Sequence, residues 1–168
     1  VYSRGRVQAA SVHKITSQVS GLVTNVSPLL KKGAQITEGE LLAQIDEQPL
    51  ILDIAQRKAT LSQTKLRLEE TQANARVARK QTGRNASDYA RFVPQLEYAN
   101  SQVEAAQAAV DYAYTQLEEA KITAPISGKV LETFIDEGDL VQTGSPIAVI
   151  NSMNDMEKWV NYQDSIDY

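Results

Sequence analysis

Few side chains in this chain of 168 residues could carry out chemistry. His13 is the only histidine and there is no cysteine, so a histidine metal cluster and a thiolate nucleophile are both excluded. Ser20 and Ser127 each precede a glycine, but His13 is the only base available for a serine–histidine triad. Three clustered carboxylates lack the ligand series of a calcium loop and are predicted to be turn residues; they are Asp136, Glu137 and Asp139. We therefore predict no enzyme activity, no cofactor and no metal site.

A basic cluster remains as the candidate functional site, and its chemistry would be partner binding. Residues 76–91 carry five basic side chains against Asp88 alone, a net charge of +4, whereas the rest of the chain nets −8. Aromatic side chains beside this charge suit an interface anchor. The predicted site consists of Arg76, Arg79, Lys80, Arg84, Tyr89, Arg91 and Phe92. The alternative is a solvated basic turn, which is the usual role of a charge cluster.

The composition of the whole chain excludes several classes of protein. Its net charge of −4 gives no general affinity for nucleic acid. No stretch approaches eighteen uncharged apolar residues, so we expect no membrane-spanning helix. Val1 leads directly into alternating sequence, so we also expect no signal peptide in this chain. The absence of cysteine fits oxidising and reducing compartments equally well.

The basic cluster lies midway along a segment with strong helical character. Pro49 to Gln81 contains no glycine and no internal proline, and good helix formers dominate it. Apolar residues recur every seven positions, which is typical of a coiled coil. The outgoing row is Ile54, Leu61, Leu68 and Ala75. The returning rows are Leu96, Val103, Val110 and Leu117, and Ala99, Ala106, Ala113 and Ala120.

These rows fit one antiparallel register. In an antiparallel pair of helices, the numbers of opposite residues add up to a constant. A sum of 171 places Leu61 opposite Val110 and Leu68 opposite Val103. The midpoint falls in residues 82–88, where Gly83 supplies turn chemistry. Pro94 is either a kink or the first turn of the second helix. The sequence thus predicts a helical hairpin with arms of roughly 50 Å and the basic cluster at its turn.

Two β motifs flank the helical segment and repeat one pattern. Residues 19–46 and 124–151 both read as alternating strands separated by glycine turns. Within each motif the second and third glycines lie six residues apart, at Gly33 and Gly39 and again at Gly138 and Gly144. Glycine reaches positive φ without steric cost, so all four are predicted to form turns. Each motif alone exposes too small an apolar face, and we expect the two to pack as one sandwich.

The motifs resemble the two halves of a lipoyl/biotinyl domain. Ala124–Val130 is similar to the signature "APISG.V" of periplasmic adaptor proteins, also called membrane fusion proteins, and Gly39–Asp46 resembles the matching first-half signature. Two such motifs on either side of a coiled-coil insert indicate this family far more specifically than either motif alone. Phe92–Leu96 looks like a branch of the resistance–nodulation–division (RND) adaptors. The chain is therefore identified as a member of the HlyD-like adaptor family, of the RND efflux type.

The resemblance implies an α+β fold: a lipoyl-like sandwich of two sequence-distant halves, an inserted antiparallel hairpin, and strands of a partial β-barrel. The expected ranges are barrel-linked strands in 1–18, half-motifs in 19–46 and 123–151, the hairpin in 47–122, and the start of the barrel in 152–168. Trp159 would lie in that barrel. Because the family continues through the barrel and a membrane-proximal domain, the chain is expected to be a piece of a longer protein.

The resemblance also implies a function without catalysis. The protein would be the periplasmic adaptor of a tripartite efflux pump in a Gram-negative bacterium, anchored to the inner membrane through a segment absent from this chain. Its partners would be an inner-membrane RND transporter, a TolC-type outer-membrane channel that meets the hairpin tip, and further copies in a side-by-side ring.

Two other functions stay open. A lipoyl or biotinyl carrier would need a modifiable lysine at a tight hairpin tip, but Lys121 lies at the end of a helical pattern and no Met-Lys-Met occurs. A lipoyl or biotinyl adduct on a lysine, detected in the intact mass of the protein, would favour this carrier function. The third possibility is a cytoplasmic coiled-coil scaffold, for which neither an export signal nor a lipid anchor would be expected.

The register generates a first prediction. Replacing Val103 with Asp should unzip the distal part of the hairpin, because an unpaired charge in the seam cannot be compensated. Circular dichroism and thermal melting measure the effect. Unchanged helicity and melting would mean that the seam is assigned to the wrong residues.

Overall fold

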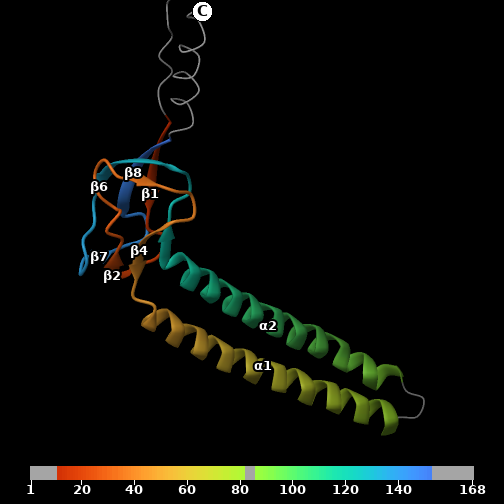
Figure 1. The fold of residues 1–168 in the computed structure, drawn as a ribbon. Helices are drawn as coiled ribbons and strands as arrows, with labels where there is room; N and C mark the ends of the chain where they lie inside the picture. The colour runs from red at the N-terminus through yellow and green to blue at the C-terminus, as the bar shows by residue number, and fades with distance from the viewer. Residues whose placement is uncertain (1–10, 82–85, 153–168) are drawn as a thin grey trace, which may run out of the picture. The chain divides into compact units, whose positions relative to one another are not determined.

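The computed structural model describes residues 11–81 and 86–152 (Figure 1). The chain separates into two compact units. The β unit combines residues before Glu47 with residues after Glu118, and the helical unit is residues 47–118. The β unit is therefore assembled from the two ends of the described chain.

Eight strands form two antiparallel sheets in the β unit. Sheet one has the order β1-β8-β6-β3 and sheet two the order β5-β4-β2-β7. The strands of sheet one are β1 (Val12–Thr16), β8 (Pro146–Ser152), β6 (Gly128–Thr133) and β3 (Gln35–Ile36). Those of sheet two are β5 (Lys121–Thr123), β4 (Leu41–Ile45), β2 (Gly21–Val26) and β7 (Leu140–Val141). Each sheet thus contains strands from both repeated motifs.

The two motifs exchange strands reciprocally. In sheet one, β3 of the first motif pairs with β6 of the second, with Ile36 opposite Gly128. In sheet two, β7 of the second motif pairs with β2 of the first, with Val141 opposite Gly21. The motifs therefore form one β module, as their repetition predicts.

Turn hydrogen bonds repeat this exchange. Gly33 N–H donates to Val130 O at 2.7 Å, and Gly138 N–H donates to Val23 O at 2.8 Å. Both glycines have φ near +90°, and Gly39 and Gly144 are also left-handed, at +81° and +87°. The prediction of turn conformations at these four glycines is confirmed. A side chain in this region of φ would be strained.

The two serines singled out by the sequence hold the turns of the opposite motif. Ser127 Oγ accepts the N–H of Glu38 at 2.9 Å, and Ser20 Oγ accepts the N–H of Thr143 at 3.1 Å. The clustered carboxylates also cap backbone groups. Asp139 Oδ2 accepts the N–H of Asp136 at 2.8 Å. These bonds confirm a turn role for that acidic cluster.

The core of the module lies between the sheets. Its largest fully buried apolar side chains are Val23, Leu42, Ile45, Val130, Ile147 and Ile150. Val23 pairs with Ile45 in sheet two, and Val130 pairs with Ile150 in sheet one. Matching positions of the two motifs thus fill matching halves of the core.

Two expected ranges differ from the structure. The expected hairpin range includes residues 121 and 122, but these belong to β5, which pairs with β4. Helix α2 ends at Glu119, and the β-branched Ile122 and Thr123 favour a strand. Val12–Thr16 was assigned to strands leading from a barrel, but as β1 it pairs with β8 inside this module. Its buried residue Ile15 belongs to the core. The strands expected in residues 1–10 and the start of a barrel expected in residues 153–168 lie outside the described residues.

The helical unit consists of two antiparallel helices (Figure 1). They are α1 (Gln48–Gln81) and α2 (Ala86–Glu119), each of 34 residues. At 1.5 Å per residue each is about 50 Å long. Pro49 lies in the first turn of α1, as expected. Pro94 lies inside α2 rather than in its first turn, so the helix lacks the bond that its N–H would have made.

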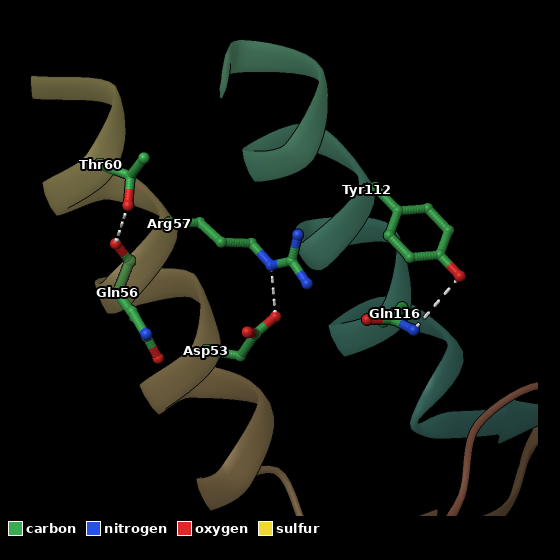
Figure 2. Close-up of polar contacts among 6 residues, drawn as sticks. All are labelled: Asp53, Gln56, Arg57, Thr60, Tyr112 and Gln116. Carbon is green, nitrogen blue, oxygen red and sulfur yellow. Dashed lines mark hydrogen bonds and ion pairs between the residues drawn. The ribbon is translucent and has the colours of Figure 1, made fainter. Parts of the chain in front are cut away.

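The heptad rows face the partner helix. Ile54, Leu61 and Ala75 on α1, and Val110 and Ala113 on α2, are all buried. One contact between the helices, near the start of α1, agrees with the predicted register. Lys58 Nζ lies 5.0 Å from the ring centroid of Tyr114 on α2. Figure 2 shows Arg57 on the same part of α1, where its Nε bonds Asp53 at 2.6 Å.

The close approach of β6 to β8 generates a second prediction. A Cβ at Gly128 would collide with the backbone oxygen of Asn151. Gly128→Ala should therefore lower the free energy of unfolding by about 3 kcal/mol, because a paired strand cannot move aside. Chemical denaturation measures the loss.

Gly138→Ala is the matched control. It has φ of +91° but open space around its Cα, so only backbone strain of about 1 kcal/mol is expected. If both variants lose the same free energy of unfolding, the close contact between β6 and β8 at Gly128 does not add to the cost of a side chain there.

Candidate partner-binding surface

Three residues of the predicted site project from the end of α1. Arg76, Arg79 and Lys80 are all exposed and lie within its last two turns. Arg76 Nε lies 3.4 Å from the backbone oxygen of Gln72, so this side chain runs along its own helix. The structure thus brings three cations together on one end of one helix.

Three of the other predicted residues belong to α2. Arg91 is exposed and Phe92 is half-buried on α2. Tyr89 belongs to α2 by its backbone, but its side chain lies outside the description, as does all of Arg84. The described part of the site is therefore Arg76, Arg79, Lys80, Arg91 and Phe92.

A hollow of about 230 Å³ lies beside these cations, and the sequence did not single it out. It is lined by Gln72, Ala75, Arg76, Arg79 and Leu96. Ala75 and Leu96 are partners in the predicted register, and the small alanine leaves the space. In the sequence, the feature that indicates this hollow is Ala75, the small residue that ends the heptad row of Ile54, Leu61 and Leu68.

The ends of the helices supply a structural reason for some of this charge. Arg79 and Lys80 lie in the last turn of α1, where the carbonyl end of the helix dipole stabilises cations. Arg76 and Arg91 lie further inside their helices and receive no such stabilisation. Part of the positive charge is thus explained by the fold and part of it is not.

Other kinds of site find no support in residues 11–81 and 86–152. No three histidine, aspartate or glutamate side chains of this part gather as a metal site would need. Neither described helix is long and apolar enough to cross a membrane. The arrangement offers exposed positive charge, a small hollow lined by polar and apolar side chains, and exposed helix faces, all of which could bind a partner.

Comparison with known proteins identifies the family. A family model described as "RND MFP, barrel-sandwich hybrid domain" matches residues 11–152. The chain belongs to the RND membrane fusion protein family. This confirms the resemblance read from residues 39–46 and 124–130. The matched span covers both repeated motifs and the helices between them, so the two units together form the barrel-sandwich hybrid domain of this family.

Individual relatives agree with the family. The chain is 35% identical over 164 residues to multidrug resistance protein MdtA of Proteus mirabilis, which covers 91% of this chain and 38% of that protein. It is 32% identical over 155 residues to multidrug efflux pump subunit AcrA of Escherichia coli K12, covering 86% and 37% respectively. The chain thus spans less than two fifths of the length of these relatives.

Solved structures share the fold. A chimeric MacA–MexA protein with the Pseudomonas aeruginosa MexA α-hairpin domain superposes with a TM-score of 0.59 at 30% identity, covering 84% of this chain and 48% of that one. A putative efflux transporter from Bacteroides eggerthii reaches a TM-score of 0.67 at 22% identity, covering 87% and 41%. This second likeness supports the fold alone.

The helix ends generate a third prediction. Lys80→Gln should lower the stability of the hairpin by about 0.5 kcal/mol at low salt and by less at high salt, because a cation near the carbonyl end of α1 is lost and salt screens its effect. Thermal melting at two ionic strengths measures it. Arg91→Gln is the matched control and should change nothing. A larger, salt-independent loss in Lys80→Gln would place this side chain in a packing contact instead.

Proposed function

We propose that this chain is the barrel-sandwich portion of a non-catalytic periplasmic adaptor, which links an inner-membrane RND transporter to a TolC-type outer-membrane channel. Membership of the RND membrane fusion protein family supports this, and relatives carry the names of efflux pump subunits and multidrug resistance proteins. Within the proposal, the β unit is a lipoyl/biotinyl-like sandwich and the helical unit is its inserted coiled-coil hairpin.

The observation that carries the proposal is the exposed cluster Arg76, Arg79, Lys80 and Arg91 near the turn of the hairpin. The chain as a whole is acidic, so the cluster reverses the local sign of charge. Copies arranged side by side in a ring would concentrate these cations and favour an acidic or carbonyl-rich channel mouth. Phe92 and Tyr89 would add desolvated contact, which charge alone does not supply.

The proposal also includes location and membrane attachment. The adaptor would lie in the periplasm of a Gram-negative bacterium and be anchored to the inner membrane by a segment beyond this chain. The transported compound would be handled by the transporter and the channel, so the adaptor itself would need neither a cofactor nor a catalytic residue.

The carrier function is weaker on structural grounds. A carrier displays its lysine in a tight turn between the two halves of the module, whereas here β4 leads into α1. Lys121 lies in β5 and not at a turn. A lipoyl or biotinyl adduct on the intact mass of the expressed protein would nevertheless establish the carrier and refute the adaptor.

Charge reversal at the tip tests the proposed docking. Arg79→Glu combined with Arg84→Glu should abolish crosslinking to the cognate channel and efflux complementation, while the helicity of the hairpin stays intact because neither residue belongs to the seam. The salt-dependent part of binding should be lost first, since rim charges act mainly on the association rate.

Lys65→Glu combined with Arg67→Glu is the matched control. Both residues are exposed on the middle of α1, so the same change of charge is made away from the turn. Full activity of the Arg79→Glu, Arg84→Glu protein, or equal loss in the control, would contradict docking through the basic tip.

A further inference from the structure

The internal repeat of the β unit places two equivalent corners on its surface. Corner one lies where β3 pairs with β6, and corner two lies where β7 pairs with β2. The cross-strand pairs occupy equivalent positions, with Gln35 opposite Lys129 at corner one and Leu140 opposite Leu22 at corner two. The two corners therefore share a backbone arrangement and differ in their side chains.

Each corner also includes the turn that precedes its short strand. Gly33 N–H donates to Val130 O at 2.7 Å at corner one, and Gly138 N–H donates to Val23 O at 2.8 Å at corner two. In both corners the valine N–H donates to the carbonyl of the residue after the glycine, at 2.9 Å and 2.8 Å respectively. Two backbone bonds thus hold each turn against the strand beside it.

The two corners carry opposite charge. Corner one is formed by Lys31, Lys32, Ala34, Gln35 and Lys129, and corner two by the equivalent residues Asp136, Glu137, Asp139, Leu140 and Leu22. Three lysines at corner one give a charge of +3, whereas three carboxylates at corner two give −3. All of these side chains except that of Ala34 are exposed. Because the positions are equivalent in the fold, the fold does not account for the difference in charge.

These charges are not compensated within the chain. Glu137 Oε1 accepts the N–H of Val26 at 3.3 Å, and Asp139 Oδ2 accepts the N–H of Asp136 at 2.8 Å. Both donors are neutral backbone groups. Within residues 11–81 and 86–152, no basic side chain forms an ion pair with a carboxylate of corner two, and no acidic side chain forms one with a lysine of corner one. Each corner therefore retains its charge for an external partner.

The exposed pairs of the two corners point away from each other. Each exposed residue of a pair is followed along its strand by a buried core residue. These buried residues are Ile36 and Val130 in sheet one, and Val23 and Val141 in sheet two. Successive side chains of a strand point to opposite faces of its sheet, so both exposed pairs lie on the outer faces of the sandwich. The two outer faces of a sandwich point in opposite directions.

Corner two adds apolar surface to its charge. Leu22 is 45% exposed and Leu140 is 76% exposed, and they lie opposite each other on β2 and β7. At corner one the side chain of Lys129 lies over the turn, because a Cβ built at Gly33 would be 3.9 Å from Lys129 Cε. The methylene groups of a lysine offer apolar contact while its ammonium group meets a charge. The two leucines can thus pack on this stem.

We propose that corner two of one copy binds corner one of a second copy of this chain, with carboxylates facing lysines and the two leucines packing on the stem of Lys129. Two corners of the same kind repel each other, so the contact joins unlike corners. Because these lie on opposite faces, each copy contacts one neighbour at each corner, in a head-to-tail arrangement. This inference deepens the proposed function: it rests on the side-by-side arrangement of copies and names the surface that joins their β units.

A charge swap tests the proposal by sedimentation equilibrium of the 168-residue chain. Lys31→Glu combined with Lys32→Glu makes corner one acidic, and Asp136→Lys combined with Glu137→Lys makes corner two basic. Each variant alone should associate at least about tenfold more weakly than the unaltered chain, because like charges face each other. An equimolar mixture should recover association, since every contact between the two variants joins an acidic corner to a basic one.

Single substitutions supply the controls. Lys14→Glu reverses an exposed lysine on β1, at the opposite end of sheet one from β3, and should associate as the unaltered chain does. Leu140→Ser should weaken association about threefold without a change of charge, because apolar contact is lost. Val12→Ser alters a side chain that is 59% exposed on β1 and should have no effect. High salt should weaken association of the unaltered chain.

A mixture that associates no more strongly than either variant alone would overturn the proposal. Association of the Lys31→Glu, Lys32→Glu variant at the strength of the unaltered chain would also overturn it. The Arg79→Glu, Arg84→Glu protein should associate normally; loss of association only there would place the contact between hairpins instead. A protein that associates through its corners but does not complement efflux would contradict the proposed function and leave this inference standing.

Discussion

Each half of the β module forms some strand pairs of its own but needs the other half to complete its backbone hydrogen bonds. The bonds from Gly33 to Val130 and from Gly138 to Val23 are the centre of this exchange, and the hydroxyls of Ser20 and Ser127 extend it to the next turns. A buried backbone group without a partner costs about as much as a lost hydrogen bond. The buried residues Val23 and Val130 each accept such a bond from the other half, so the two halves stabilise each other although helices α1 and α2 separate them in the chain.

The same constraint determines what can be inserted between the halves. β4 and β5 pair with each other, with Gln44 opposite Lys121, so an insert that leaves after one strand must return beside it. An antiparallel helical hairpin meets this requirement, because its two ends lie at the same end. The seam of Ile54, Leu61 and Val110 supplies its own apolar burial. The hairpin is thus a separate compact unit. The chain enters it from β4 and leaves it into β5, which are neighbouring strands.

Side chains that could have carried out chemistry are used to build this frame. The two serines and the acidic cluster at Asp136–Asp139 bind backbone N–H groups of turns. The proposed function relies on a surface instead, namely the exposed cations Arg76, Arg79, Lys80 and Arg91 near the distal ends of α1 and α2. Such a surface suits a protein of the RND membrane fusion family, whose relatives include a named efflux pump subunit.

The sequence by itself determined the repeated β motifs, the turn glycines and the heptad rows, because glycine spacing and a seven-residue period are local consequences of φ and of helix geometry. The family followed from the resemblance of residues 39–46 and 124–130 to its signatures. Where the sequence was misleading, the cause was also local. The strand at 121–123 follows directly on a helical pattern, and Pro94 is tolerated inside a helix that packing holds together. Only the tertiary structure decided which motif completes which turn, because reciprocal strand exchange is a long-range pairing that leaves no period in the sequence. It alone placed β1 and β5 at the ends of the two described sheets, since strand order is set by pairing between segments far apart in the chain.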